Sequence, residues 1–408
     1  MGGVSMEWKE VRLGDIADVQ TGPFGSQLHK SDYIAEGIPC IMPTNIGPHL
    51  NFIVDGIAHV SEVDANRLSR HLTEIGDIIY ARRGDIEKCA YVTTNEEKWL
   101  CGTGCLKIRC NNEVNSRFIA YLLSTAECKK WITGNAVGTT MLNLSKGILS
   151  NLPLLVPSHE DQRRIASILS SLDRKIELNN KINADLEEMA QAIFKNWFVD
   201  FEPFKDGKFV DSELGMIPEG WKVGTLGDIT KNKSAKVKER NDVKVLSPVT
   251  TGELVLSEEY FTKQVFSSSI AKYKIVNKGD FAYNPARVNI GSLGRNEFDF
   301  DGCVSPVYVV FSVLDGYENY FDLFRKTDFF KDSVASLAIG GVRQSLSYDD
   351  LSSIEVIIPS ENAVEEFNNL YNQMKKTIKA NKLESSRLSL LRDTLLPRLM
   401  SGEIEVPE

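Results

Sequence analysis

WKEVRLGDI, at residues 8–16, decides the fold prediction, because almost the same stretch returns as WKVGTLGDI at residues 221–229. A second match begins with a Gly-Asp pair and runs into apolar residues: GDIIY at 76–80 returns as GDFAY at 279–283. The two matches keep their order and are shifted by 213 and 203 residues. Internal similarity at a nearly constant offset is the signature of a repeated structural unit.

A third match supports the repeat. LSKGILSNLPLLVPS at residues 144–158 returns as LSYDDLSSIEVIIPS at residues 346–360, a shift of 202 residues. Three matches in one order indicate a tandem duplication, with about ten residues gained or lost between the first and second matches. A chance recurrence of short motifs would not keep that order. The chain is therefore expected to contain two related globular units.

A long helix is expected after each copy, because apolar or small residues recur there at steps of three and four. The first covers about residues 160–198, and its predicted packing residues are Ile165, Leu169, Leu172, Ile176, Leu186, Ile193 and Trp197. The second covers about residues 363–396, and its predicted packing residues are Phe367, Met374, Leu388, Leu391 and Leu395. Each stripe has a polar middle, and Pro397 is expected to end or kink the second helix. Because such stripes must be buried, the helices are expected to pack on each other.

The segments before each helix mix strand and helix signals, which predicts an α+β chain. In the first copy, strands are expected at residues 37–42, 77–81 and 105–109 and a short helix at 116–125. The second copy shows the same pattern at residues 280–283, 306–311 and 317–325. The expected order is a globule at residues 1–158, a helical segment at 159–204, a second globule at 205–360 and a helical segment with a tail at 361–408.

Composition is that of an ordinary globular protein: of 408 residues, 42% are apolar and 25% charged. No window reaches the ~18 uninterrupted apolar residues of a membrane span, so a cytosolic protein is expected. The formal net charge of −9 argues at first sight against a nucleic-acid partner, since phosphate binding draws on basic patches.

Six of the seven cysteines fall in the first third of the chain, and an odd number so distributed favours reduced thiols over a disulfide framework. Cys101, Cys105 and Cys110 raise the question of zinc. Their spacings of four and five residues fit no familiar pair of CxxC knuckles, so buried free cysteines are the favoured interpretation and zinc the alternative.

The usual catalytic motifs are missing from the sequence. There is no GxxxxGK[ST] phosphate loop, no HExxH helix and no GxSxG elbow. All five histidines precede residue 160, so the second copy has none. Asn284-Pro285-Ala286-Arg287 approaches the Asn-Pro-Pro-aromatic loop of methyltransferases but lacks the second proline and the aromatic residue. A binding protein is favoured over an enzyme.

The helical segment carries a family resemblance. DQRRIASILSSLDRKIELNNKINADLEEMAQAIFKNWFVDFEPF, at residues 161–204, strongly resembles the first conserved region of the specificity subunit of bacterial type I restriction-modification enzymes. The two WKxxxLGDI stretches, GDFAYNPARVNIGS at 279–292 and LLPRLMSGEI at 395–404 are similar to the same family. Departures occur before the helices: family members often have Pro-Pro and Glu-Gln there, whereas this chain has VPSHEDQ at 156–162 and IPSEN at 358–362.

The resemblance implies two target-recognition domains, at residues 1–158 and 205–360, each reading one half of a split DNA sequence. The two helices would form an antiparallel coiled coil that holds the halves a fixed distance apart. The chain would be a non-catalytic cytoplasmic subunit that recruits two modification subunits and, with them, the restriction subunits. No cofactor is expected in this chain; the modification subunits would use S-adenosylmethionine to methylate adenine, and the restriction subunits ATP and Mg.

The acidic balance confines any DNA contact to local patches. The densest basic segment, residues 231–244, includes Lys233, Lys236 and Lys238. Lysines in such a segment are expected to contact phosphates. The alternative is a solvated lysine-rich loop.

An arginine loop follows each Gly-Asp strand, with Arg82, Arg83 and Lys88 in the first copy and Arg287, Asn289 and Arg295 in the second. Arginine can bind the O6 and N7 edge of guanine, and asparagine the adenine edge, so these loops are predicted to read bases. The alternative is that they pair with nearby acids such as Asp85 or Asp299. The polar turns at residues 135–143 and 340–344, the second containing Arg343, are further candidates at equivalent places.

Two other functions remain open at this point. One is a standalone DNA-binding or inhibitory protein that uses the same fold without methyltransferase partners. The other is a DNA methyltransferase or nuclease whose site has no familiar motif. Binding of S-adenosylmethionine by this chain alone would favour an enzyme, and co-purification with a larger methyltransferase chain would favour a specificity subunit.

Overall fold

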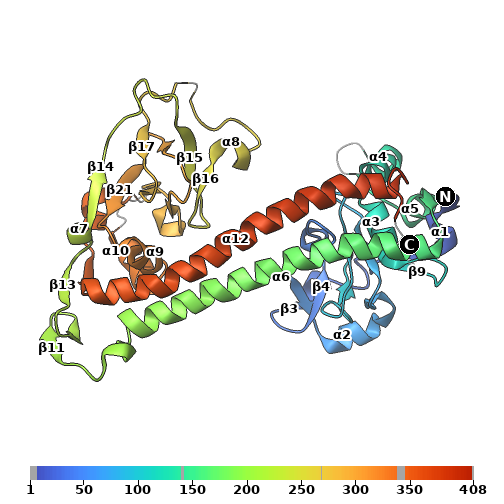
Figure 1. Ribbon diagram of the computed structural model, residues 1–408. Helices are drawn as coiled ribbons and strands as arrows, with labels where there is room; N and C mark the ends of the chain where they lie inside the picture. Colours follow the sequence, from blue (N-terminus) through green and yellow to red (C-terminus); the bar gives the residue numbers. More distant parts are fainter. Residues whose placement is uncertain (1–6, 139–141, 268, 338–344, 407–408) are drawn as a thin grey trace. The chain divides into compact units, whose positions relative to one another are not determined.

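The computed structural model describes residues 7–138, 142–267, 269–337 and 345–406 and divides into two compact units. One unit comprises residues 1–180 and 382–408, and the other residues 181–381. Each holds one copy of the repeat and a segment of both long helices, α6 (His159–Phe198) and α12 (Glu361–Met400) (Figure 1). Within each unit the globule packs on both helices.

In the first unit the two ends of the repeat pair with each other. β1 (Lys9–Arg12) lies antiparallel to β10 (Pro153–Val156), with Lys9 opposite Val156. The other strands form two four-stranded sheets. The first has the order β2 (Ala17–Thr21), β9 (Cys105–Cys110), β6 (Ile78–Ala81), β7 (Cys89–Tyr91), and the second β3 (Tyr33–Ile34), β5 (Ala58–Val60), β4 (Ile38–Ile41), β8 (Leu100–Cys101).

The second unit repeats this arrangement. β13 (Lys222–Thr225) lies antiparallel to β22 (Glu355–Ile358), with Lys222 opposite Ile358. Its sheets have the orders β14 (Thr230–Lys233), β21 (Val309–Val313), β18 (Phe281–Tyr283), β19 (Leu293–Arg295) and β16 (Leu254–Leu256), β15 (Lys244–Pro248), β20 (Gly302–Val304), β17 (Lys274–Val276). A hairpin of β11 (Phe209–Ser212) and β12 (Gly215–Pro218) precedes them. The tandem duplication is therefore one of structure as well as of sequence.

Short helices complete each unit. Those of the first are α1 (Leu13–Ile16), α2 (Glu62–Arg67), α3 (Ser116–Leu123), α4 (Ala126–Asn135) and α5 (Lys146–Ser150). Those of the second are α7 (Leu226–Ile229), α8 (Ser257–Tyr260), α9 (Glu318–Phe324), α10 (Asp328–Leu337) and α11 (Tyr348–Ser352). The fold class is α+β, as predicted, and the predicted strands and short helices are confirmed in both copies, with ends that differ by up to three residues.

The LGDI stretch forms one helical turn in each copy because its aspartate caps the turn. The backbone N–H of Arg12 donates to Asp15 Oδ2 at 3.2 Å, and that of Thr225 donates to Asp228 Oδ2 at 2.7 Å. The leucine and isoleucine of each stretch are buried in the core of their unit. A side chain at Gly14 would lie 2.9 Å from the Ser150 Cβ, so this turn packs directly on α5.

The two long helices pack on each other in antiparallel fashion within each unit. In the first unit, Asp173 on α6 meets Arg392 on α12, and farther along α6 Asn179 meets Glu384. The partner number falls as the α6 number rises, which is the antiparallel order. In the second unit the order is the same, because Asn183 meets Asn381 and Phe194 meets Phe367.

The predicted helix stripes are buried or half-buried except at Leu391, and much of that burial is against the globules. Ile165 and Leu169 belong to the core of the first unit, and Phe367 belongs to that of the second. Ile193, Trp197, Met374 and Leu395 are partly buried residues packed against these cores. Leu172, Ile176, Leu186 and Leu388 are half-buried.

Leu391 and Pro397 depart from the prediction. Leu391 is 46% exposed, and its neighbour Arg392 is buried instead, because the Arg392 guanidinium turns inward to Asp173. The predicted stripe is thus off by one residue at this point. Pro397 does not end α12, which continues to Met400.

All seven cysteines are free thiols, and every one except the half-buried Cys110 is buried. Burial raises the pKa of Cys101 and of Cys110 to about 12, which keeps both thiols protonated and unreactive. These cysteines therefore act as small apolar core residues. None of the helices in the described ranges combines the length and the apolar character that crossing a bilayer requires.

Candidate nucleic-acid interface

The Gly-Asp pair of the first copy builds the start of β6. Gly76 has φ +94°, a left-handed conformation that favours glycine, and Asp77 accepts the backbone N–H of Glu74 at 2.8 Å. The buried Asp77 carboxylate also accepts two bonds from the Arg109 guanidinium, at 2.8 and 2.7 Å. Because these bonds tie the turn to β9, the position of the loop after β6 is defined.

The second copy builds β18 in the same way. Gly279 has φ +86°, and Asp280 accepts the backbone N–H of Asn277 at 2.9 Å. Burial raises the pKa of Asp280, and Lys233 partly offsets that effect by donating to its carboxylate at 2.7 and 3.0 Å. Lys233, predicted to contact DNA, thus takes the place that Arg109 holds in the first copy, as an internal partner of the turn.

The arginine loop of the first copy lies against the polar turn that was the further candidate. Leu144 donates its backbone N–H to the Arg82 carbonyl at 2.9 Å. The backbones of Arg83 and Asn143 pair in a single antiparallel β-bridge. Arg83 is exposed, and Lys88 is exposed with a 3.4 Å ion pair to Asp85. Two segments about 60 residues apart in sequence therefore meet at one place.

Arg82 is the half-buried cation of this loop. Its Nε is buried and has no hydrogen-bond partner among the residues that the structure describes. Burial, and secondarily the charge of Arg83, lower the pKa of its guanidinium. The guanidinium lies over the ring of Phe24, 5.9 Å from its centroid, and Phe24 is 53% exposed. An exposed aromatic ring with a guanidinium over its face is a surface suited to a nucleobase.

The arginine loop of the second copy accepts the equivalent backbone bond. Leu346 donates its backbone N–H to the Pro285 carbonyl at 3.1 Å. Arg287 and Asn289 are exposed on this loop. Among the described residues, Arg287 forms no ion pair. Arg343, the candidate in the polar turn itself, lies outside the described residues.

Arg295 is held inside the second unit. Its side chain is 16% exposed, and its Nη1 donates to Asn319 Oδ1 at 3.0 Å. Its guanidinium also lies over the Phe281 ring, 5.8 Å from the centroid. The predicted alternative partner, Asp299, instead pairs with Lys278 and Lys379. Arg295 therefore stabilises the interior of the second unit, whereas Arg287 is exposed.

The basic segment at residues 231–244 is only partly available. Arg240 pairs with Asp242 and Asp301, and the Lys244 ammonium lies over the Phe300 ring. Lys236 and Lys238 are exposed, and both belong to the surface of a loop at residues 234–240. Two of the three predicted lysines are thus placed where a phosphate can reach them.

A cavity of about 470 Å³ opens beside Arg287. One wall is the turn between β15 and β16, and the other is the arginine loop; the lining includes Pro248, Thr250, Tyr260, Asn284, Arg287 and Tyr308. Tyr260 is 54% exposed. Aromatic faces together with amide and guanidinium donors suit the edge and the face of a base.

Phe24 and Tyr260 were not among the candidates from the sequence. Phe24 stands in the stretch TGPFGS, whose Gly and Pro residues predict a loop but do not show that the ring is exposed. Tyr260 is followed by Phe261, with ring centroids 5.0 Å apart, and nothing in its local sequence distinguishes it from a core residue.

Comparison with known proteins bears on these features. The family model of the type I restriction modification DNA specificity domain matches residues 6–188. The MjaIX specificity subunit of Methanocaldococcus jannaschii, a type I restriction enzyme subunit, is 27% identical over 421 residues, which cover 100% of this chain and 96% of the relative. This chain belongs to the specificity subunits of type I restriction-modification systems. The resemblance seen in the sequence is confirmed.

Other specificity subunits agree over the same length. The HindI specificity subunit of Haemophilus influenzae is 26% identical over 487 residues, covering 98% of this chain and 100% of the relative. The crystal structure of a type I S subunit from M. genitalium superposes with a TM-score of 0.61 at 17% identity, covering 100% and 98% of the two chains. Both copies and both long helices therefore belong to the fold of this family.

Proposed function

We propose that this specificity subunit reads a bipartite DNA site, with one half read by the loops of each unit. One observation carries the proposal: the arginine loop of each copy accepts the same backbone bond, from Leu144 to Arg82 in the first copy and from Leu346 to Pro285 in the second. To read two different half-sites, a duplicated protein needs the same scaffold in both copies and different residues on the loops. The cations proposed to reach base edges are Arg82, Arg83 and Arg287, with Asn289 beside the last.

Lys236, Lys238 and Lys88 are proposed to contact phosphates, which position the loops without reading sequence. Because the formal net charge is −9, we propose that the chain has little phosphate affinity of its own. We therefore propose that the modification subunits also bind the DNA and supply most of the phosphate contacts. This removes the conflict between the acidic composition and the function.

The chain is proposed to be non-catalytic and to assemble with two modification subunits and with restriction subunits in the cytoplasm. S-adenosylmethionine would belong to the modification subunits, and ATP and Mg to the restriction subunits. The tandem duplication supports two copies of the modification partner, because each unit presents a related surface.

Sequencing of methylated adenines in a host that carries the modification subunit, with and without this chain, tests the proposal. The expected result is one interrupted motif that is methylated only when the chain is present. Methylation that does not depend on the chain, or a continuous motif, would contradict it. DNA binding by the chain without any change in methylation would favour a standalone binding protein.

A further inference from the structure

Arg325, directly after α9, is a buried cation that the proposed DNA contacts do not use. Its side chain is 9% exposed, as is that of its partner Asp322. The Arg325 Nη2 and Nε both donate to Asp322 Oδ1, at 2.7 and 2.9 Å. Burial by itself would raise the pKa of Asp322, but Arg325, Lys326 and Lys375 hold it at about 2, so the carboxylate is charged.

The remaining donors of Arg325 join the two walls of the cavity beside Arg287. Nη1 donates to the Leu293 carbonyl at 2.8 Å, at the end of the arginine loop. Nη2 donates to the Gly252 carbonyl at 3.1 Å, in the turn between β15 and β16. A single planar guanidinium thus fixes the separation of the walls, which a lysine ammonium with its compact charge would not do in the same way.

The walls are also packed backbone against backbone. Ser292 Oγ donates to the Pro248 carbonyl at 2.9 Å. Gly291 has φ +95°, and a Cβ there would lie 2.6 Å from the Thr250 carbonyl oxygen. Because no side chain separates the walls at this point, their spacing depends on hydrogen bonds to carbonyls. Arg325 supplies two of these bonds.

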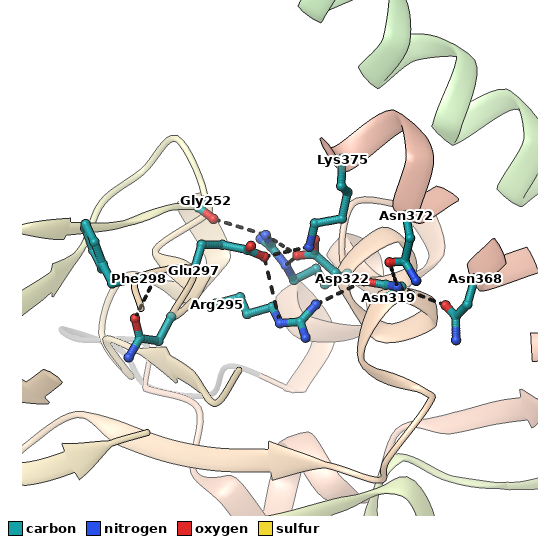
Figure 2. A network of polar contacts seen from close by, with 11 residues as sticks. Gly252, Arg295, Glu297, Phe298, Asn319, Asp322, Asn368, Asn372 and Lys375 are labelled. Atoms are coloured by element: carbon teal, nitrogen blue, oxygen red, sulfur yellow. Dashed lines mark hydrogen bonds and ion pairs between the residues drawn. The ribbon is translucent and has the colours of Figure 1, made fainter. Parts of the chain in front are cut away.

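The same network continues to α12, as Figure 2 shows. Asn319 accepts a bond from Arg295 and donates to Asn368 and Asn372, at 2.9 Å each. Lys375 on α12 pairs with Glu297 at 2.7 Å. The strand that follows the arginine loop is therefore tied to the long helix as well as to the opposite wall.

The first copy has no counterpart of this pair. At the offset of 202 residues, Asp322 aligns with Ala120 and Arg325 with Leu123, and both are fully buried. In the first unit, two buried apolar residues thus occupy the positions that the ion pair occupies in the second. Because apolar residues commonly replace a buried ion pair without loss of stability, stability alone does not explain why the second copy has one.

We propose that Arg325, held by Asp322, is a positioning residue for reading the second half-site. It keeps the arginine loop and the facing turn at the separation at which Arg287 and Asn284 meet the same base pairs. The inference rests on the proposed function and assigns to the second unit a requirement that the first does not have.

The test is the double variant Asp322→Ala/Arg325→Leu, which installs the residues of the first copy, in the full complex with the modification subunit. Binding is measured to duplexes that carry single-base changes in one or the other half-site. The expected result is a roughly 10- to 100-fold loss of discrimination in the second half, the range set by one or two base contacts, with the first half unchanged. The matched control is Asp328→Ala/Lys331→Leu, which removes an exposed ion pair on the next helix.

Thermal unfolding of the double variant near the wild-type temperature would show that the fold is kept. Unchanged discrimination in the second half, with a wild-type motif otherwise intact, would overturn the positioning role. Equal loss in both halves would also overturn it, since it would mean a general structural defect. A wild-type complex with no bipartite motif at all would contradict the proposed function itself, and is thereby distinguished from the other results.

Discussion

In the first unit, α6 and α12 are joined by a buried ion pair, whereas the second unit joins them with aromatic rings. Arg392 Nη1 donates to Asp173 Oδ1 at 2.9 Å, and the Tyr121 hydroxyl donates to the same carboxylate. In the second unit, Phe198 lies 5.0 Å from Phe367 and 5.1 Å from Tyr320 between ring centroids. The ion pair of the first junction is stable only if its charged atoms keep their hydrogen-bond geometry. The aromatic rings of the second junction stabilise it mainly by burying apolar surface.

The same contrast holds at the loops. Both copies keep the Gly-Asp turn and the backbone bond from Leu144 or Leu346 to the arginine loop, while the side chains on the loops are different. The Arg82 guanidinium lies over the Phe24 ring, and Arg287 lines a cavity whose two walls are joined by Arg325. Duplication followed by change at the loops and junctions leaves two units that fold alike and present different side chains.

The largest expected effect is at the aromatic junction. Phe194→Ala should lower the free energy of unfolding by about 3–5 kcal/mol, because this ring is 1% exposed and contacts Phe198, Tyr320 and Phe367. Chemical denaturation measures it. Leu396→Ala, at the aligned and only half-buried position of the first unit, should cost less; a larger cost there would reverse the comparison.

At the ionic junction, Arg392→Leu should cost about 3 kcal/mol, because it leaves the Asp173 carboxylate in a largely buried site without its cation. Adding Asp173→Leu should restore most of the stability, since the uncompensated charge is then gone. Arg398→Leu is the matched control on the same helix, with an exposed ion pair to Glu403 worth under about 1 kcal/mol. A double variant no more stable than Arg392→Leu would argue against this explanation of the junction.

The lysine segment distinguishes the copies electrostatically. Between the LGDI stretch and the second sheet of each unit, the first copy has one cation, Lys30, and the second has Lys231, Lys233, Lys236, Lys238 and Arg240. Lys236→Ala and Lys238→Ala should each weaken DNA binding by the complex equally for all sequences and reduce the salt slope by about 1. Lys331→Ala should leave the slope unchanged, and a slope unchanged in all three would remove the segment from the interface.

The smallest effect is a mild acid sensitivity of the first junction. Burial lowers the pKa of His49, and Arg392 lowers it further, while Asp393 and Asp173 partly offset this. The unfolded chain therefore binds the proton more readily, so the stability contributed by neutral His49 is full above pH 6.5 and declines as the pH falls below that value. Unfolding measured at pH 7 and pH 5 should show a larger drop for the wild type than for His49→Gln. An equal drop would assign the acid sensitivity to other groups.

Much of this architecture follows from the sequence because repeats and helix stripes are local patterns. The three matches located both copies, and the strands at residues 77–81 and 280–283 followed from runs of apolar residues after Gly-Asp. Leu391 was misplaced because a period of three and four residues does not say whether a leucine or its arginine neighbour faces inward. That choice depends on Asp173, more than 200 residues away in the chain.

The candidate cations show the same limit. Composition cannot separate Lys233, which binds Asp280, from Lys236, which is exposed, because their partners come from distant strands. Arg287 lies in the loop before β19 and Arg295 lies in β19 itself. The sequence does not show that Arg295 donates to Asn319, which comes from α9. Phe24 and Arg325 carry no motif, and their roles appear only once Arg82 and the cavity walls are in place.

The most direct test of the central claim, that each unit reads its own half-site, is to compare the methylated motifs directed by Arg82→Ala and by Arg287→Ala. Each change should relax specificity in one half of the motif, at a cost of about 1–3 kcal/mol if the arginine reads a base. The account predicts that the two variants relax different halves and leave the other half intact. Relaxation of the same half by both variants, or an unchanged motif in both, would contradict it.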